Sequence, residues 1–92
     1  MKVIKISALW CSGCLVMNPI WNKALKNYSF ESEEYDLDLD EEIVKKYNPL
    51  EKLPLFIVLQ DDQEISRFSG EYSYDDLIRK LKDVGVIDEK NN

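Results

Sequence analysis

The sequence contains no histidine and only two cysteines, and both shortages narrow its chemistry. A zinc site within one chain takes about four ligands. Two thiols without histidine would therefore need carboxylates or a second chain to complete such a site. A short secreted chain would carry more cysteines, arranged in a disulfide framework. These absences favour a redox-active pair of thiols, and we expect no bound metal or other cofactor.

Long apolar runs and an excess of basic residues are also missing. No run approaches the roughly 20 residues that span a bilayer, and the N-terminal stretch, interrupted by Lys5, ends in no small-residue cleavage site. The net charge of −6 argues against a nucleic-acid partner, because phosphate backbones are bound by clustered Lys and Arg. We expect a cytoplasmic monomer that binds neither membrane nor nucleic acid.

The length and composition allow one globular domain. A chain of 92 residues can bury a single modest core. Its 45% hydrophobic and 33% charged residues are typical of a soluble globular chain rather than a disordered one. No internal repeat or linker divides it. We therefore expect a single domain over residues 1–92.

Hydrophobic periodicity predicts alternating strands and helices. Strands are expected over residues 2–8, 35–40, 55–59 and 64–68, and helices over residues 12–28, 40–47 and 73–84. A helix between the first two strands favours a parallel crossover, and the short turn at residues 60–63 requires an antiparallel pair. Asp40 and Ser73 are expected to cap the second and third helices. The predicted fold class is α/β, a four-stranded mixed sheet in the order β-α-β-α-β-β-α with helices on both faces.

Cys11 and Cys14 lie where the first predicted strand meets the first helix. Their spacing places both thiols on one turn, close enough to form a disulfide. The positive end of the helix lowers the pKa of the first thiol. Cys11 precedes the helix and should be the more exposed, so we expect it to be the nucleophile and Cys14 the resolving thiol. The plainer alternative is a pair of buried structural cysteines.

The motif and its surroundings resemble the thioredoxin family. The run Trp10-Cys11-Ser12-Gly13-Cys14 resembles the family's W-C-x-x-C motif, and Pro19 matches its helix-kinking proline. Leu53-Pro54 resembles the hydrophobic-proline step whose peptide bond is cis in the family and faces the disulfide. Gly70 falls where the family has a glycine before its last helix.

This resemblance implies a thioredoxin-like fold and a thiol–disulfide oxidoreductase. Its partners would be disulfide-containing proteins, and a reductase or another dithiol donor would recharge it. The catalytic residues would be Cys11 and Cys14. The resemblance also implies a set of substrate-binding residues: Trp10, Ser12, Gly13, Leu53, Pro54 and Gly70.

Three features depart from the family pattern. Too few residues precede Cys11 to hold the usual first strand and helix, which makes the layout closer to glutaredoxin. The central dipeptide is Ser12-Gly13 rather than Gly-Pro. Lys5 stands where thioredoxins have a buried acidic residue that relays a proton for the second cysteine. We expect Lys5 to be a surface lysine, with a position near Cys14 as the alternative.

Two other functions remain open at this point. One is glutaredoxin-like use of glutathione. Against it, Lys52 precedes Leu53-Pro54 where glutaredoxins have Thr-Val-Pro, and Glu71 would repel the carboxylates of glutathione. The other is a binding module, either an adaptor with an idle disulfide or two chains that share a metal. Tyr72 and Tyr74 could line a substrate groove or simply pack.

Overall fold

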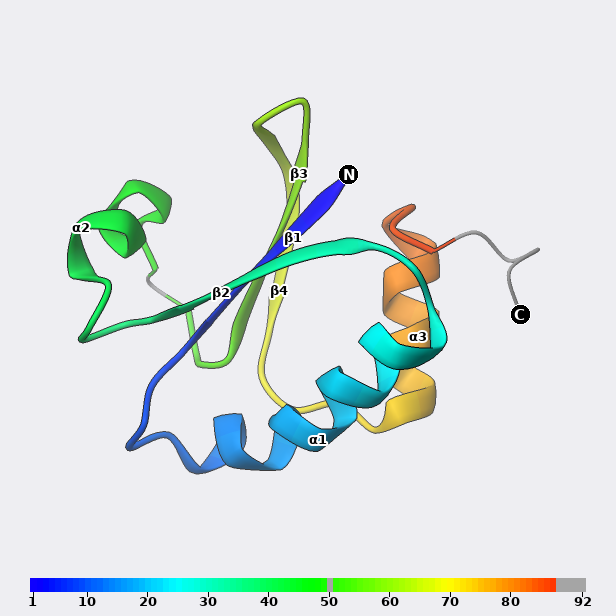
Figure 1. Ribbon diagram of the computed structural model, residues 1–92, viewed down its shortest axis with the longest axis horizontal. Helices are drawn as coiled ribbons and strands as arrows, with labels where there is room; N and C mark the ends of the chain where they lie inside the picture. Colours follow the sequence, from blue (N-terminus) through cyan, green and yellow to red (C-terminus); the bar gives the residue numbers. More distant parts are fainter. Residues whose placement is uncertain (50, 88–92) are drawn as a thin grey trace.

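The computed structural model describes residues 1–49 and 51–87, and the frayed tail expected at residues 88–92 lies outside them. Figure 1 shows the course of the chain. The elements are β1 (Lys2–Ser7), α1 (Ser12–Asn27), β2 (Glu31–Asp36), α2 (Glu41–Val44), the 3₁₀ turn η1 (Lys45–Tyr47), β3 (Leu55–Gln60), β4 (Gln63–Ser69) and α3 (Tyr74–Asp83). Within the described residues, no helix is long and apolar enough to cross a bilayer.

The four strands form one mixed sheet in the order β2-β1-β3-β4. β1 pairs with β2 in parallel and with β3 in antiparallel fashion. β3 and β4 form an antiparallel hairpin. Its two-residue turn consists of Asp61 and Asp62, which both have positive φ, at 52° and 65°. Two such residues in succession suit a tight hairpin turn. The predicted fold class is confirmed.

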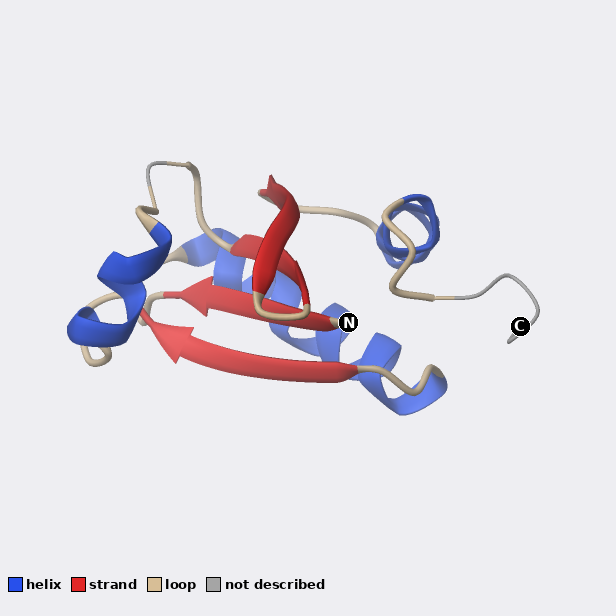
Figure 2. Ribbon diagram, turned by 90° about the horizontal axis from the view of Figure 1, so that it is seen from above, coloured by secondary structure: helices blue, strands red, loops and turns tan. Residues whose placement is uncertain are grey.

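The sheet has a hydrophobic core on each face. One core joins β1 and β3 to α1 and α3 through residues that include Trp21, Phe56 and Leu77. The other joins the opposite faces of the same strands to α2, where Val44 is the buried residue. Figure 2 shows the sheet between α2 on the left and α3 on the right. Successive apolar residues of β3 belong to one core and then the other, as expected for a central strand that is buried on both faces.

The predicted position of the second strand was wrong. β2 begins at Glu31 rather than at Tyr35, and it ends at Asp36. The carboxylate of Asp36 accepts hydrogen bonds from the backbone N–H groups two and three residues ahead, at 2.8 and 3.0 Å. These bonds close a turn, and Leu39 in this turn is 76% exposed. The predicted strand over residues 35–40 is therefore largely a turn, which covers residues 37–40.

One of the two predicted helix caps is present in the structure. Ser73 accepts a hydrogen bond from the backbone N–H of Asp76 at 3.1 Å, which confirms the cap of α3. Asp40 occupies the N-cap position of α2, but its carboxylate makes no capping bond there. It accepts instead from the N–H of Asp36 at 2.8 Å. The side-chain cap predicted for Asp40 was therefore wrong.

Candidate active site

Cys11 occupies the N-cap position of α1, at the end of the loop that follows β1. Its backbone is extended (φ −89°, ψ 112°), and its Sγ accepts a hydrogen bond from the backbone N–H of Cys14 at 3.2 Å. The first N–H groups of a helix have no partner within the helix and carry partial positive charge. A thiolate at this sulfur would therefore be stabilised by the end of α1.

Both thiols are free and nearly enclosed. Cys11 is 9% exposed and Cys14 2% exposed, so the order of exposure is the one expected. Burial and a hydrogen bond to Cys11 raise the pKa of Cys14 to about 11, against smaller lowering effects from Ala8 and Lys5. At neutral pH Cys14 therefore holds its proton.

The high pKa of Cys14 predicts selective alkylation. Iodoacetamide should label Cys11 of the reduced protein near pH 7 and leave Cys14 unmodified. Labelling of Cys14 should rise about tenfold per pH unit towards pH 11, because only the thiolate reacts. Peptide mapping by mass spectrometry measures both sites, with urea-unfolded protein as the control that labels both. Equal labelling of the two thiols in the folded protein at pH 7 would contradict the assignment.

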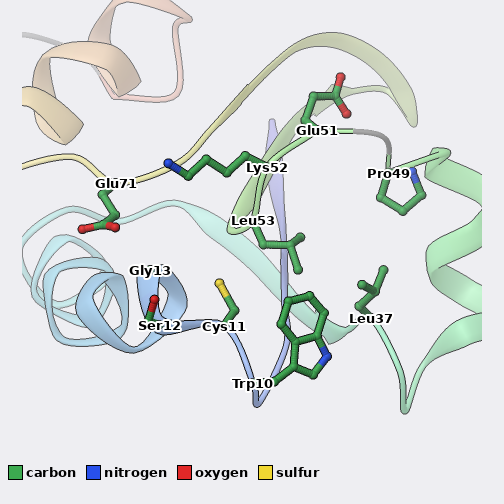
Figure 3. Close-up of a pocket in the computed structure, with 10 residues that line it drawn as sticks. All are labelled: Trp10, Cys11, Ser12, Gly13, Leu37, Pro49, Glu51, Lys52, Leu53 and Glu71. Carbon is green, nitrogen blue, oxygen red and sulfur yellow. The ribbon is translucent and has the colours of Figure 1, made fainter.

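A pocket of about 550 Å³ opens beside Cys11. Figure 3 shows the Cys11 sulfur pointing into the space between Leu53 and Gly13. Five residues of the predicted site line it: Trp10, Cys11, Ser12, Gly13 and Leu53. The other lining residues are Leu37, Pro49, Glu51, Lys52 and Glu71. The structure thus brings most of the predicted site together around the first thiol.

Trp10 forms an exposed wall of this pocket. The residue is 66% exposed, yet its orientation is fixed because the indole Nε1–H donates to Asp38 Oδ2 at 2.7 Å. Asp38 belongs to the turn after β2. The bond therefore ties the loop before Cys11 to that turn, and it leaves the apolar ring free to contact a substrate.

Pro54 and Gly70, two of the predicted substrate-binding residues, are not among the residues that line the pocket. The Leu53–Pro54 peptide bond is cis. The backbone N–H of Gly70 donates to Pro54 O at 2.9 Å, and Gly70 has φ +92°, a conformation that side chains disfavour. These two residues support the segment that carries Leu53, and a role for them in substrate binding stays a prediction.

Comparisons with known proteins agree with this geometry. A family model described as Thioredoxin matches residues 1–83. The chain belongs to the thioredoxin family. It is 29% identical over 80 residues to Thioredoxin H-type from Fagopyrum esculentum. The aligned region covers 86% of this chain and 67% of that protein. It is 31% identical over 78 residues to the chloroplastic Thioredoxin Y1 from Arabidopsis thaliana, which covers 83% of this chain.

The chain spans 45% of the length of that chloroplastic thioredoxin. Among solved structures, oxidised mitochondrial thioredoxin 3 from Saccharomyces cerevisiae superposes with a TM-score of 0.76 at 28% identity. The match covers 89% of this chain and 76% of the yeast protein. Membership of the thioredoxin family supports thiol–disulfide oxidoreductase activity in general.

The family's buried acidic position holds a buried lysine in this thioredoxin-like chain. Lys5 is 1% exposed, so the expectation of a surface lysine was wrong. Its Nζ donates to Asn18 Oδ1 at 2.6 Å and to Glu34 Oε2 at 2.9 Å. The polar partners explain how a lysine tolerates burial. The positive charge also lowers the pKa of Cys14 slightly, in line with the alternative placement.

Of the charged residues that line the pocket, Lys52 and Glu71 had been noted in the sequence, whereas Glu51 was missed. Glu71 lies against Gly13, where an added Cβ would come within 3.2 Å of Glu71 Oε2. Glu51 is held by Arg67 Nη1 at 2.9 Å, and another Arg67 nitrogen donates to Tyr47 O at 2.8 Å. Arg67 of β4 thereby fixes the segment before Leu53. Its position two residues before Leu53 was the only sequence signal for Glu51.

Tyr72 and Tyr74 pack rather than line the pocket. The Tyr72 ring makes an edge contact with Phe68, with centroids 5.6 Å apart. The Tyr74 hydroxyl accepts a hydrogen bond from Asn27 at 2.9 Å.

In the part of the chain that the structure describes, no three His, Cys, Asp or Glu side chains gather to hold a metal. A metal shared by two chains would need ligands from both.

Proposed function

We propose that this protein reduces protein disulfides through Cys11 and Cys14. The observation that carries the proposal is the position of the Cys11 sulfur, which accepts the N–H of Cys14 at the start of α1 and faces an open pocket. The Cys11 thiolate attacks one sulfur of a substrate disulfide, and the other substrate sulfur leaves as a thiolate. A mixed disulfide with Cys11 results.

The second step releases the substrate. Cys14 loses its proton and attacks the Cys11 sulfur, so a Cys11–Cys14 bond forms while the bond from Cys11 to the substrate breaks. Two electrons pass from the protein to the substrate. A reductase or another dithiol donor then returns two electrons to the Cys11–Cys14 disulfide.

The pocket favours a polypeptide substrate over glutathione. Trp10, Leu37 and Leu53 offer apolar surface on one side of Cys11. Glu71 lies on the other side, against Gly13, where its negative charge opposes the carboxylates of glutathione. We therefore propose protein disulfides as the substrate class, and glutathione-dependent reduction as the less favoured activity.

The proposal is tested by comparing two substrates. With dithiothreitol as the donor, the protein should reduce insulin disulfides well above the uncatalysed rate. With glutathione, it should reduce hydroxyethyl disulfide poorly. Glu71→Gln should raise the glutathione-dependent rate about threefold, since an exposed charge contributes roughly 0.5–1 kcal/mol, and should leave insulin reduction unchanged. Faster reduction with glutathione than with dithiothreitol and insulin would overturn the choice of substrate.

We also propose that the protein works in the cytoplasm as a monomer. Its two cysteines are both assigned to the redox pair, and cytoplasmic proteins rarely carry structural disulfides. A dithiol of this kind needs a supply of reducing equivalents, which a reducing compartment provides.

A further inference from the structure

The buried polar cluster beside Cys14 suggests where the proton of the resolving thiol goes, provided that the proposed reductase function holds. Lys5, on β1, connects α1 to β2 because its Nζ bonds both Asn18 and Glu34. Its side chain is 1% exposed, while that of Glu34 is 49% exposed. The cluster therefore runs from the interior to solvent.

Two features of local geometry place this cluster next to Cys14. Lys5 is directly opposite Glu34 in the parallel pairing of β1 with β2, so the two side chains share one face of the sheet. Asn18 lies one helical turn beyond Cys14, so these two side chains share one face of α1. The hydrogen bond from Lys5 to Asn18 connects this face of the sheet to this face of α1.

A second pocket, of about 390 Å³, opens at this cluster. Cys14, Asn18 and Glu34 all contribute to its lining, and it shares no lining residue with the pocket beside Cys11. Asn18, Glu34 and Asp36 give this cavity polar groups at which water can bind. Water can thus approach Cys14 from a side that a substrate bound at Cys11 does not cover.

The other titratable groups around Cys14 are already engaged. Among the described residues, β1 contributes the Lys5 ammonium, a donor, and the N-cap of α1 contributes Cys11, the thiol that Cys14 attacks. From β2 come Tyr35, whose hydroxyl donates to Glu33 at 2.6 Å, and Asp36, whose carboxylate holds two backbone N–H groups.

Among the described residues that line the second pocket, two further carboxylates belong to Asp40 and Glu34. Asp40, from the turn before α2, binds the N–H of Asp36. Glu34 alone is tied to the Lys5–Asn18 cluster, and its half-exposed side chain can pass a proton on to solvent.

We propose that Glu34 accepts the proton of Cys14 through water in the second pocket, and that Lys5 is the residue that positions Glu34. As the Cys14 sulfur bonds to the Cys11 sulfur, its proton moves through water to the Glu34 carboxylate. The substrate sulfur leaves Cys11 as a thiolate and takes the electron pair of the broken bond. Glu34 then releases the proton to solvent. The raised pKa of Cys14 supports the need for such an acceptor.

The test separates the two steps by stopped-flow reaction of the reduced protein with 5,5′-dithiobis(2-nitrobenzoate). The first thionitrobenzoate released reports attack by Cys11, and the second reports attack by Cys14 on the mixed disulfide. Glu34→Gln should leave the first phase unchanged and slow the second at least tenfold at pH 7, since a positioned base contributes about 10²–10⁴-fold. The difference from the parent should shrink as pH approaches the pKa of Cys14.

Glu33→Gln is the matched control, because it removes the same charge from the adjacent position of β2, where Glu33 bonds Lys2 instead. It should leave both phases unchanged. Glu34→Asp keeps a carboxylate and should give an intermediate second phase. A second phase in Glu34→Gln that matches Glu33→Gln at every pH would overturn the proposal, as would a Glu34→Asp rate as low as that of Glu34→Gln. Loss of the first phase in the parent would instead overturn the proposed function.

Discussion

Replacing Cys14 by serine is expected to trap the substrate on Cys11. The variant keeps the Cys11 sulfur at the start of α1, and the bond from the N–H of residue 14 is a backbone bond that the substitution leaves in place. Attack on a substrate disulfide should therefore proceed, but no thiol remains to resolve the product. Insulin reduction should fall at least a hundredfold, and the mixed disulfide should accumulate on non-reducing gels and in intact-mass spectra.

Cys11→Ser provides the complementary result. This variant should form no mixed disulfide and should also lose insulin reduction, because Cys14 is 2% exposed and protonated at neutral pH. A Cys14→Ser protein that turns over normally with excess thiol would show a monothiol mechanism in place of the one proposed.

Replacing Trp21 by alanine is expected to produce the largest loss of stability among single substitutions in α1. Trp21 is fully buried and packs against Phe56 and Phe30, with ring centroids 4.9 and 5.6 Å apart. Such truncations cost about 3–5 kcal/mol in the free energy of unfolding. Urea denaturation followed by far-ultraviolet circular dichroism measures the change without depending on tryptophan emission.

The second tryptophan is the matched control. Trp10 is 66% exposed, so Trp10→Ala should cost about 1 kcal/mol or less through its bond to Asp38, while insulin reduction falls. Trp21→Phe should cost less than Trp21→Ala, because the indole N–H is buried without a hydrogen-bond partner in the described residues and phenylalanine removes that donor. Equal destabilisation by Trp10→Ala and Trp21→Ala would contradict this division between the two residues.

Local sequence signals predicted the elements that carry the dithiol. Cys11 and Cys14 lie between an apolar strand and an amphipathic helical pattern, at the start of the helix, and both patterns depend on residues close in sequence. The apolar run within Leu55–Gln60 likewise predicts a central strand, because a strand that is buried on both faces does not alternate apolar with polar residues. These features needed no knowledge of distant contacts.

Other features depended on partners that are remote in sequence. Lys5 is buried because Glu34 and Asn18 meet its ammonium group, and no local pattern around Lys5 indicates either partner. β2 was misplaced because it is an outer strand that contains none of the buried hydrophobic residues by which strands are usually detected. The position of Glu51 in the pocket depends on Arg67, which lies sixteen residues further along the chain and bonds it at 2.9 Å.

The composition of β2 has a consequence for self-association. One edge of this strand has no neighbouring strand in the described part of the chain, and such edges can template the joining of a second copy. Glu31, Glu33 and Glu34 stand along it, and they outnumber Lys2 and Lys5, the two lysines with which they form ion pairs. Two copies that approach edge to edge would therefore bring two strands of net negative charge together. Hydrogen bonds from Tyr35 and then Lys2 lower the pKa of Glu33, which keeps its charge in more acidic solution than an ordinary glutamate. We therefore expect repulsion along this strand to oppose sheet extension until the carboxylates are protonated.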